Sequence, residues 1–197
     1  MGVNPRIAHL ALAVAFAAVM GGCSPAAYYG TFQAGKLEGK LTVQWLEPDK
    51  FLFIPDEYKP LTFTRANGDV IEPGRMLTDG GSIPRPLWIL RNYSPWGYAP
   101  AFIVHDWLFA MKHCQPPGYK DYTYQDAALV MAEIMKTMME SELVDVDKAT
   151  VLSMYLAVSS PVAESLWNDG KCEPPPAESE LLVRKKPIAE YELNFEN

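Results

Sequence analysis

The chain has 197 residues, of which 49% are hydrophobic and 21% are charged, and it contains 3 cysteines. This composition is typical of a globular protein and excludes a disordered chain, a collagen-like repeat and a small disulfide-packed scaffold. The length fits one domain with short appendages. The 24 acidic residues outnumber the 17 Lys and Arg, and the net charge of −7 disfavours binding to phosphate backbones, so we expect no nucleic-acid partner.

The N-terminus is predicted to be an export signal. Residues 10–20 (LALAVAFAAVM) form an apolar run behind a start that carries Arg6, and this run is shorter than the ~20 residues that a membrane span needs. A Gly-Gly pair then precedes Cys23, which resembles a bacterial lipoprotein signal in which the cysteine is lipidated and becomes the first mature residue. An ordinary cleaved signal peptide is the alternative. Ser24 after the cysteine indicates the outer membrane under Gram-negative sorting rules, so we expect an envelope lipoprotein anchored on its periplasmic side.

The mature chain is expected to hold a single domain over residues 40–172. Before it come the signal peptide at residues 1–22 and a lipidated tether at residues 23–39, whose small, weakly patterned residues need no packed element. After it, residues 173–197 are expected to form a Pro-rich linker and a peripheral tail.

Two cysteines remain for the exported domain. Because the exported compartment is oxidising, Cys114 and Cys172 could pair. Two reduced surface thiols are the alternative, since the sequence does not give the Cα separation that a disulfide requires. Cleavage before Cys23 would remove Arg6 and no acidic residue, so the mature chain would be more acidic by one charge.

The first half of the domain is predicted to be a small antiparallel sheet. Short strand-like runs are separated by turn signals, of which Asn67-Gly68 is the strongest because this dipeptide suits a two-residue hairpin turn. The Gly- and Pro-rich residues 75–88 are expected to form an ordered loop without a regular element. The predicted strands are residues 41–46, 51–54, 61–65 and 69–72.

The second half is predicted to be helical, which gives an α+β fold. Proline and polar capping residues mark where each helix begins, and a Pro-Pro-Gly turn separates the first helix from the second. The Met-rich second helix is expected to pack in the core. The predicted helices are residues 101–112 after Pro100, residues 123–139 with Asp121 or Thr123 as cap, and a third from near Asp145 or Asp147, which Pro161 either kinks or follows with a further helix ending near Gly170.

Three segments stand out for their chemistry: residues 77–85 (LTDGGSIPR), 98–109 (YAPAFIVHDWLF) and 124–128 (YQDAA). Their order resembles a family common in phage and prophage genomes, domain of unknown function 1353. Members show a TD loop ending in PR, then a helix with HD, then an Asp early in the next helix. The resemblance covers roughly Leu61 to Val158 and implies phage-associated relatives without an established activity.

His105 and Asp106 are the first candidate site residues. Adjacent side chains on a helix diverge by about 100°, so we expect these two to face different neighbours. Asp126 lies near the start of the next helix, where an antiparallel helix hairpin would bring it level with His105. A carboxylate that accepts one imidazole N–H fixes the tautomer and leaves the other nitrogen free as a base. Asp106 would then be free to bind a cation or to cap the glycine loop.

This constellation is similar to the helical core of secreted phospholipases A2. The resemblance implies that His105 activates water and that Asp126 orients it. It also implies that Asp106 binds calcium together with the backbone carbonyls of Gly80 and Gly81. The crosslinking cysteines and the glycine-loop spacing of that family do not occur in this sequence.

Two further chemical hypotheses use the same region. In one, Ser82 is the nucleophile, His105 is its base, and Asp126 or Asp79 orients the imidazole. In the other, His105 binds a metal together with Asp106 and His113, although two helical turns separate the histidines.

The noncatalytic alternative treats these residues as a polar clasp between loop and helices, in which Arg85 pairs with Asp79 or Asp106. Two functions therefore stay open. One is a His/Asp-dependent hydrolase acting on a lipid or another envelope substrate. The other is a structural or interaction protein of the envelope or of a phage.

Overall fold

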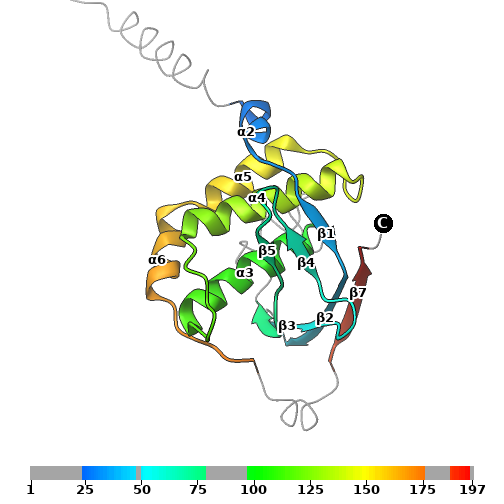
Figure 1. The fold of residues 1–197 in the computed structure, drawn as a ribbon, viewed down its shortest axis with the longest axis vertical. Helices are drawn as coiled ribbons and strands as arrows, with labels where there is room; N and C mark the ends of the chain where they lie inside the picture. Colours follow the sequence, from blue (N-terminus) through cyan, green and yellow to red (C-terminus); the bar gives the residue numbers. More distant parts are fainter. Residues whose placement is uncertain (1–23, 48–49, 79–96, 176–186, 196–197) are drawn as a thin grey trace, which may run out of the picture.

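The structure is a computed structural model that describes residues 24–47, 50–78, 97–175 and 187–195 (Figure 1). Within these ranges the strands form two antiparallel sheets, and most of them come before the helices α3 to α6 in the sequence. The predicted α+β fold is thus confirmed. One sheet has the strand order β1-β4-β5 and the other has the order β6-β3-β2-β7. The strands are β1 (Lys36–Glu38), β2 (Lys40–Glu47), β3 (Lys50–Pro55), β4 (Thr62–Thr64), β5 (Val70–Ile71), β6 (Met76–Thr78) and β7 (Ala189–Asn194), and the helices are α2 (Pro25–Thr31), α3 (Ala99–Cys114), α4 (Tyr124–Glu140), α5 (Lys148–Val158) and α6 (Pro161–Asp169).

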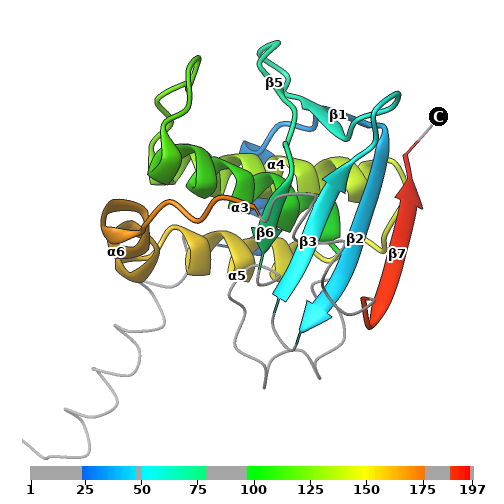
Figure 2. The ribbon, with the colours of Figure 1, turned by 90° about the horizontal axis from the view of Figure 1, so that it is seen from below.

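The four-stranded sheet packs one face against the helices. Along β2, alternate residues such as Leu41 and Val43 are buried, because strand side chains alternate between the two faces of a sheet. Along β3, the three consecutive residues Phe51, Leu52 and Phe53 are buried, so this strand is covered on both faces. Figure 2 shows α3, α4 and α5 gathered on one side of β3, β2 and β7. The methionines of α4 lie in this core, as predicted: Met131, Met135, Met138 and Met139.

The β4–β5 hairpin turns at Asn67-Gly68, as predicted. Gly68 has a φ of +86°, a left-handed conformation that glycine adopts without a Cβ clash. The turn is closed by hydrogen bonds from Arg65 N to Asp69 O and from Gly68 N to Arg65 O.

The helices begin where the sequence places their caps. Pro100 lies in the first turn of α3, the Thr123 side chain caps α4, and Asp147 caps α5. Pro161 starts the separate helix α6, and Gly170 follows its last residue. None of the helices in the described ranges is both long enough and apolar enough to cross a membrane.

Four short elements were not predicted. Helix α2 lies in the segment expected to be a tether, and it packs against α5. Strand β1 precedes the predicted start of the domain, and β6 lies in the segment expected to be an irregular loop. Strand β7 lies in the segment expected to be a peripheral tail, but it pairs with β2 along Lys40–Trp45 and is followed by the buried Phe195.

The two cysteines of the domain form a disulfide. Cys114 is the last residue of α3 and Cys172 lies two residues beyond Gly170, with their Cα atoms 4.6 Å apart. This settles the alternative that the sequence left open in favour of pairing. The predicted signal peptide and Cys23 lie outside the described residues.

Candidate functional site

The candidate site lies in the middle of α3, where an apolar helix carries two polar residues side by side. Residues 99–104 are buried, and His105 is also buried, with only 6% of its surface exposed. Its Nδ1 lies 3.4 Å from Oδ1 of Asp106. The other carboxylate oxygen of Asp106 accepts a hydrogen bond from the Thr78 hydroxyl at the end of β6. We call His105 and Asp106 the dyad.

The second nitrogen of His105 has no partner among the described residues. Nε2 is shielded from solvent, and no hydrogen-bonding group of the described chain reaches it. The ring of Phe109, one helical turn further along α3, lies 4.9 Å from the imidazole. A buried polar atom left without a hydrogen bond costs about 1–3 kcal/mol of folding free energy. Within the described part of the chain, Nε2 of the dyad is therefore left without the hydrogen bond that a purely structural histidine would make.

The expectation that His105 and Asp106 face different neighbours was wrong. The Cα–Cβ directions of adjacent helical residues do diverge. Both side chains nevertheless have rotatable bonds beyond Cβ, and these bring Nδ1 and Oδ1 together.

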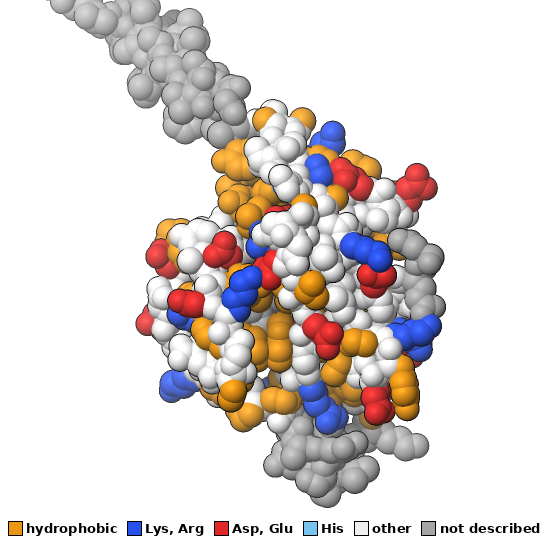
Figure 3. Space-filling model, in the orientation of Figure 1, with side chains coloured by type: hydrophobic (Ala, Val, Ile, Leu, Met, Phe, Trp, Pro, Cys, Tyr) orange, Lys and Arg blue, Asp and Glu red, His pale blue; other side chains and the backbone are white. Residues whose placement is uncertain are grey.

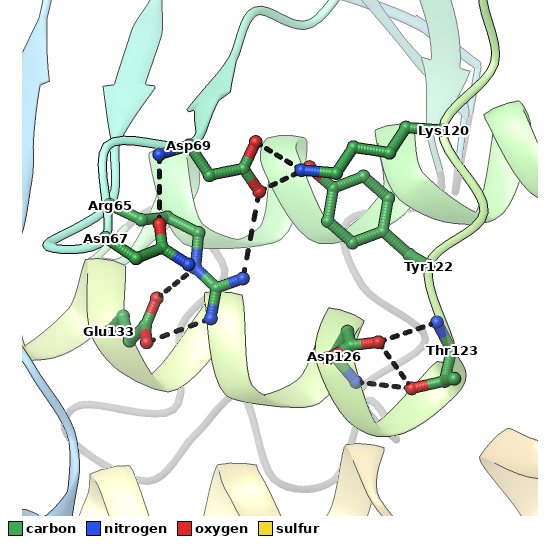
Figure 4. Close-up of polar contacts among 8 residues, drawn as sticks. All are labelled: Arg65, Asn67, Asp69, Lys120, Tyr122, Thr123, Asp126 and Glu133. Carbon is green, nitrogen blue, oxygen red and sulfur yellow. Dashed lines mark hydrogen bonds and ion pairs between the residues drawn. The ribbon is translucent and has the colours of Figure 1, made fainter.

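Asp126 does not orient His105. Its Oδ2 accepts hydrogen bonds from the backbone N of Thr123 at 2.9 Å and from the Thr123 hydroxyl at 2.7 Å (Figure 4). The Thr123 oxygen in turn accepts from the backbone N of Asp126. This reciprocal arrangement is a capping box, which satisfies two free N–H groups at the start of α4. Asp126 thus stabilises its own helix. The carboxylate beside His105, which was predicted to be that of Asp126, is that of Asp106.

The glycine loop of the candidate site lies outside the described residues. This applies to four predicted site residues, Asp79, Gly80, Gly81 and Ser82, and to the predicted clasp residue Arg85. The loop follows Thr78 directly in the chain, so its first residue is covalently next to the partner of Asp106. The roles predicted for these residues stay predictions.

The calcium and metal hypotheses gain no support from the described residues. No three His, Cys, Asp or Glu side chains in these ranges are grouped to hold a metal ion. Asp106 uses one oxygen for Thr78 and directs the other towards His105. His113, the third residue of the metal hypothesis, has its Nε2 3.1 Å from the carbonyl oxygen of Leu166 at the end of α6.

A second polar cluster was missed by sequence reasoning, and we call it the ionic network: Arg65, Asp69, Lys120, Tyr122 and Glu133 (Figure 4). Arg65 donates two hydrogen bonds to the Glu133 carboxylate, Nε to Oε2 at 2.7 Å and Nη2 to Oε1 at 3.1 Å. Both side chains are at most 10% exposed. The signal available in the sequence was Glu133 itself, a charged residue on the apolar face of α4, which requires a buried partner.

Asp69 joins this network to the segment before α4. Its two oxygens accept hydrogen bonds from Lys120 Nζ at 2.6 Å and from the Tyr122 hydroxyl at 2.7 Å. Burial by itself would raise the pKa of Asp69, but these two hydrogen bonds, together with the charges of Lys120 and Arg65, outweigh it and hold the pKa below its ordinary value. The ionic network therefore fastens the β4–β5 hairpin to α4 and supplies no free nucleophile or base.

A hollow of about 360 Å³ lies elsewhere, between the start of α3 and the α4–α5 connection. Burial, followed by the carboxylates of Asp147 and Asp145, raises the pKa of the Tyr98 hydroxyl in its wall to about 12, so Tyr98 stays protonated at neutral pH. No dyad residue takes part in its lining, which is Gly97, Tyr98, Glu142, Leu143, Val144 and Asp145.

Comparison with protein families matches residues 58–158 to the family described as "Protein of unknown function (DUF1353)". The matched segment runs from just before β4 to the last residue of α5 and contains the dyad, Thr78, Asp126 and the ionic network. Among curated proteins and among solved structures, none matches the chain. The match agrees with the extent of the resemblance inferred from the sequence motifs.

Proposed function

Because the chain belongs to the DUF1353 family, whose description assigns no activity, we propose its function from the site itself: a hydrolase of the bacterial cell envelope in which His105 is the general base. Asp106 is the positioning residue for its ring. One observation carries this proposal. Nδ1 of His105 lies 3.4 Å from Asp106, while Nε2 has no partner among the described residues.

The two nitrogens of His105 are placed as general-base catalysis needs, with one beside a carboxylate and the other free to accept a proton. An Nδ1–H donated to the Asp106 carboxylate fixes the tautomer and leaves the lone pair on Nε2. Nε2 then takes a proton from a water molecule as the water oxygen attacks the substrate carbonyl. The resulting imidazolium, stabilised by Asp106, returns that proton to the leaving oxygen as its bond to the acyl carbon breaks. The Thr78 hydroxyl holds the carboxylate in place through the other oxygen.

Access to Nε2 requires a neighbouring side chain to move, because this atom is shielded from solvent. Phe109 is the described aromatic neighbour of the imidazole, and it also packs edge-on against Trp167 of α6 at 4.7 Å between ring centroids. An apolar wall beside the base suits an apolar substrate, because contact between them removes apolar surface of both from water. A lipid or lipid-linked ester is the substrate class we propose.

We also propose that the chain is exported and lipidated at Cys23, on the periplasmic side of the outer membrane. The disulfide between Cys114 and Cys172 supports export, because disulfides persist in oxidising compartments and are rare in the cytosol. Location at a membrane would place the dyad next to the proposed substrate. The phage association implied by the sequence motifs stays a prediction.

A noncatalytic role is the second candidate. The hydrogen bond from Thr78 to Asp106 ties β6 to α3, which is what a structural clasp would do. A clasp has no use for an Nε2 that none of the described residues bonds, and this favours the hydrolase. The ionic network already provides a separate fastening between sheet and helices.

The test is hydrolysis by the full-length, lipidated protein of two substrates offered separately. These are vesicles of phosphatidylethanolamine and phosphatidylglycerol, and isolated peptidoglycan. We expect His105→Gln and Asp106→Asn to remain folded and to lower the rate about 100-fold or more, which is the usual contribution of a general base. Asp126→Asn is the matched control, because it removes from the neighbouring helix a carboxylate that is partly buried, as Asp106 is. Equal rates in the wild type and in His105→Gln, or no hydrolysis of either substrate by the wild type, would leave the clasp as the better account.

A further inference from the structure

Helix α2 starts immediately after the proposed lipidation site. Ser24, the residue that follows Cys23, is the N-cap of α2, and its side-chain oxygen accepts a hydrogen bond from the backbone N of Ala27 at 3.2 Å. The helix then runs over Pro25–Thr31. No stretch of chain without regular structure therefore separates the position of the lipid from the first folded element.

Helix α2 is fixed to the body of the protein by aromatic contacts. The ring of Tyr155 in α5 lies 6.2 Å from that of Tyr28 and 5.1 Å from that of Phe32. Lys136 of α4 stands 4.3 Å from the Tyr29 ring centroid and donates to the Tyr29 carbonyl oxygen at 3.1 Å. Phe32 is 4% exposed and belongs to the main core. A lipid on Cys23 would thus be attached to a rigid part of the molecule.

Helices α2 and α5 themselves present a surface almost without charge, which is bordered by Lys148 and by the Lys136–Glu140 ion pair. Residues 24–35 contain no Asp, Glu, Lys or Arg, and in α5 the one charged residue is Lys148 at its start. Leu156, next to Tyr155 on α5, is 51% exposed. In Figure 3, hydrophobic side chains gather over α2 and α5.

We propose that the α2–α5 end of the molecule is a membrane-seating surface that rests on the bilayer carrying the lipid anchor. This inference rests on the proposed lipidation of Cys23. A seven-residue helix is about 10 Å long, so an anchor at its first residue holds the α2–α5 end close to the headgroups. Uncharged, partly apolar residues suit that interface, because they need not be stripped of strongly bound water. The anchor therefore fixes one orientation of the domain and does not act as a flexible leash.

The experiment places a photoreactive benzoylphenylalanine at Leu156 or, as the matched control, at Ile188. These positions are 51% and 57% exposed, and Ile188 precedes β7, which begins at the opposite end of the molecule from α2 (Figure 1). The lipidated full chain is incorporated into vesicles of phosphatidylethanolamine and phosphatidylglycerol and irradiated. Mass spectrometry then detects lipid adducts and the lipid on Cys23. We expect lipid adducts at the Leu156 reporter and none at the Ile188 reporter.

A second variant tests the role of the docked helix. Insertion of a flexible Gly/Ser segment of about 20 residues between Cys23 and Ser24 gives a tether of about 25 Å and should abolish the Leu156 adducts. Equal adducts at both reporters, or unchanged Leu156 adducts after the insertion, would overturn the seating surface. Absence of Leu156 adducts while Cys23 carries lipid would refute the seating surface alone. An unlipidated Cys23 would refute the anchor and the seating together, and the hydrolysis assay would still judge the dyad separately.

Discussion

Asp106 is the carboxylate beside His105, whereas Asp126 caps its own helix. Asp126 is the third helical residue after the cap Thr123, and this spacing lets it bond the cap in return. The pattern Thr-x-x-Asp was visible in the sequence, so the role of Asp126 was predictable from it. The contact between His105 and Asp106 was not predictable, because it depends on side-chain rotamers and on Thr78, which is distant in sequence.

Replacement of Asp126 by Asn should weaken α4 and leave the dyad intact. The amide is a poorer acceptor for the Thr123 N–H than the carboxylate, and the negative charge at the helix N-terminus is lost. We expect the free energy of unfolding to fall by about 0.5–2 kcal/mol in urea titrations, as for other cap substitutions. The hydrolysis rate per folded molecule should stay that of the wild type. A large loss of rate in the folded variant would restore Asp126 to the site.

Asp69 should make stability depend on pH in the acidic range. Its pKa in the folded protein lies below the ordinary value of 3.8, so the unfolded chain binds a proton first as the pH falls. The stabilisation by Asp69 is therefore fully present well above pH 3.8 and is lost as the pH falls through that value towards the lower folded pKa. Asp69→Asn should be less stable than the wild type at pH 7, and the difference should shrink below pH 4, as measured by thermal unfolding across this range. A difference that is constant with pH would contradict the assignment.

The elements that the sequence predicted well are those with a strong local pattern. Strands β2 and β3 follow from their β-forming runs, and α3 and α4 from proline and capping signals at their starts. Strand β7 and helix α2 were missed because what stabilises them is distant. Strand β7 depends on pairing with β2, and α2 depends on the rings of α5. A short element whose partners lie more than a hundred residues away leaves little trace in its own composition.

The disulfide fastens the end of α3 to the chain that leaves α6. Cys114 and Cys172 are 58 positions apart in the sequence, and α4, α5 and α6 lie between them. Closing a loop of this length should stabilise the folded state by about 2–4 kcal/mol, mainly by restricting the unfolded chain. The double variant Cys114→Ala/Cys172→Ala should therefore unfold at a lower urea concentration. Reduction of the wild type by dithiothreitol should have the same effect, and no shift on reduction would argue against a bridged protein in solution.

At the scale of the whole molecule, the sheets join the segment matched by the family to the parts of the chain outside it. Residues 58–158 contain the dyad and the ionic network, but two of their strands pair with strands outside the segment. Strand β4 pairs with β1, and β6, which carries Thr78, pairs with β3. The position of the Asp106 partner is thus set by a sheet whose other strands, β3, β2 and β7, lie outside the family segment. The geometry of the dyad and the completeness of the sheet are therefore linked.

Because of this link, deletion of β7 tests how the sheet contributes to the whole fold. Deletion of residues 187–197 would remove β7 and the buried Phe195, and it would expose the edge of β2 along Lys40–Trp45. An unpaired central strand loses its hydrogen bonds on one side and offers a template for aggregation. We expect the truncated protein to unfold at a lower temperature and to aggregate in sedimentation experiments.

Single substitutions separate the two contributions of this C-terminal segment. Phe195→Ala should lower the free energy of unfolding by about 3 kcal/mol, because it leaves a cavity where a ring is now 8% exposed. Glu192→Gln, on the exposed side of the same strand, should change it by less than about 0.5 kcal/mol. If Phe195→Ala and the truncation both leave stability unchanged, the segment is a dispensable tail. If instead they lower both stability and the hydrolysis rate, the edge strand maintains the sheet that positions Thr78 against the dyad.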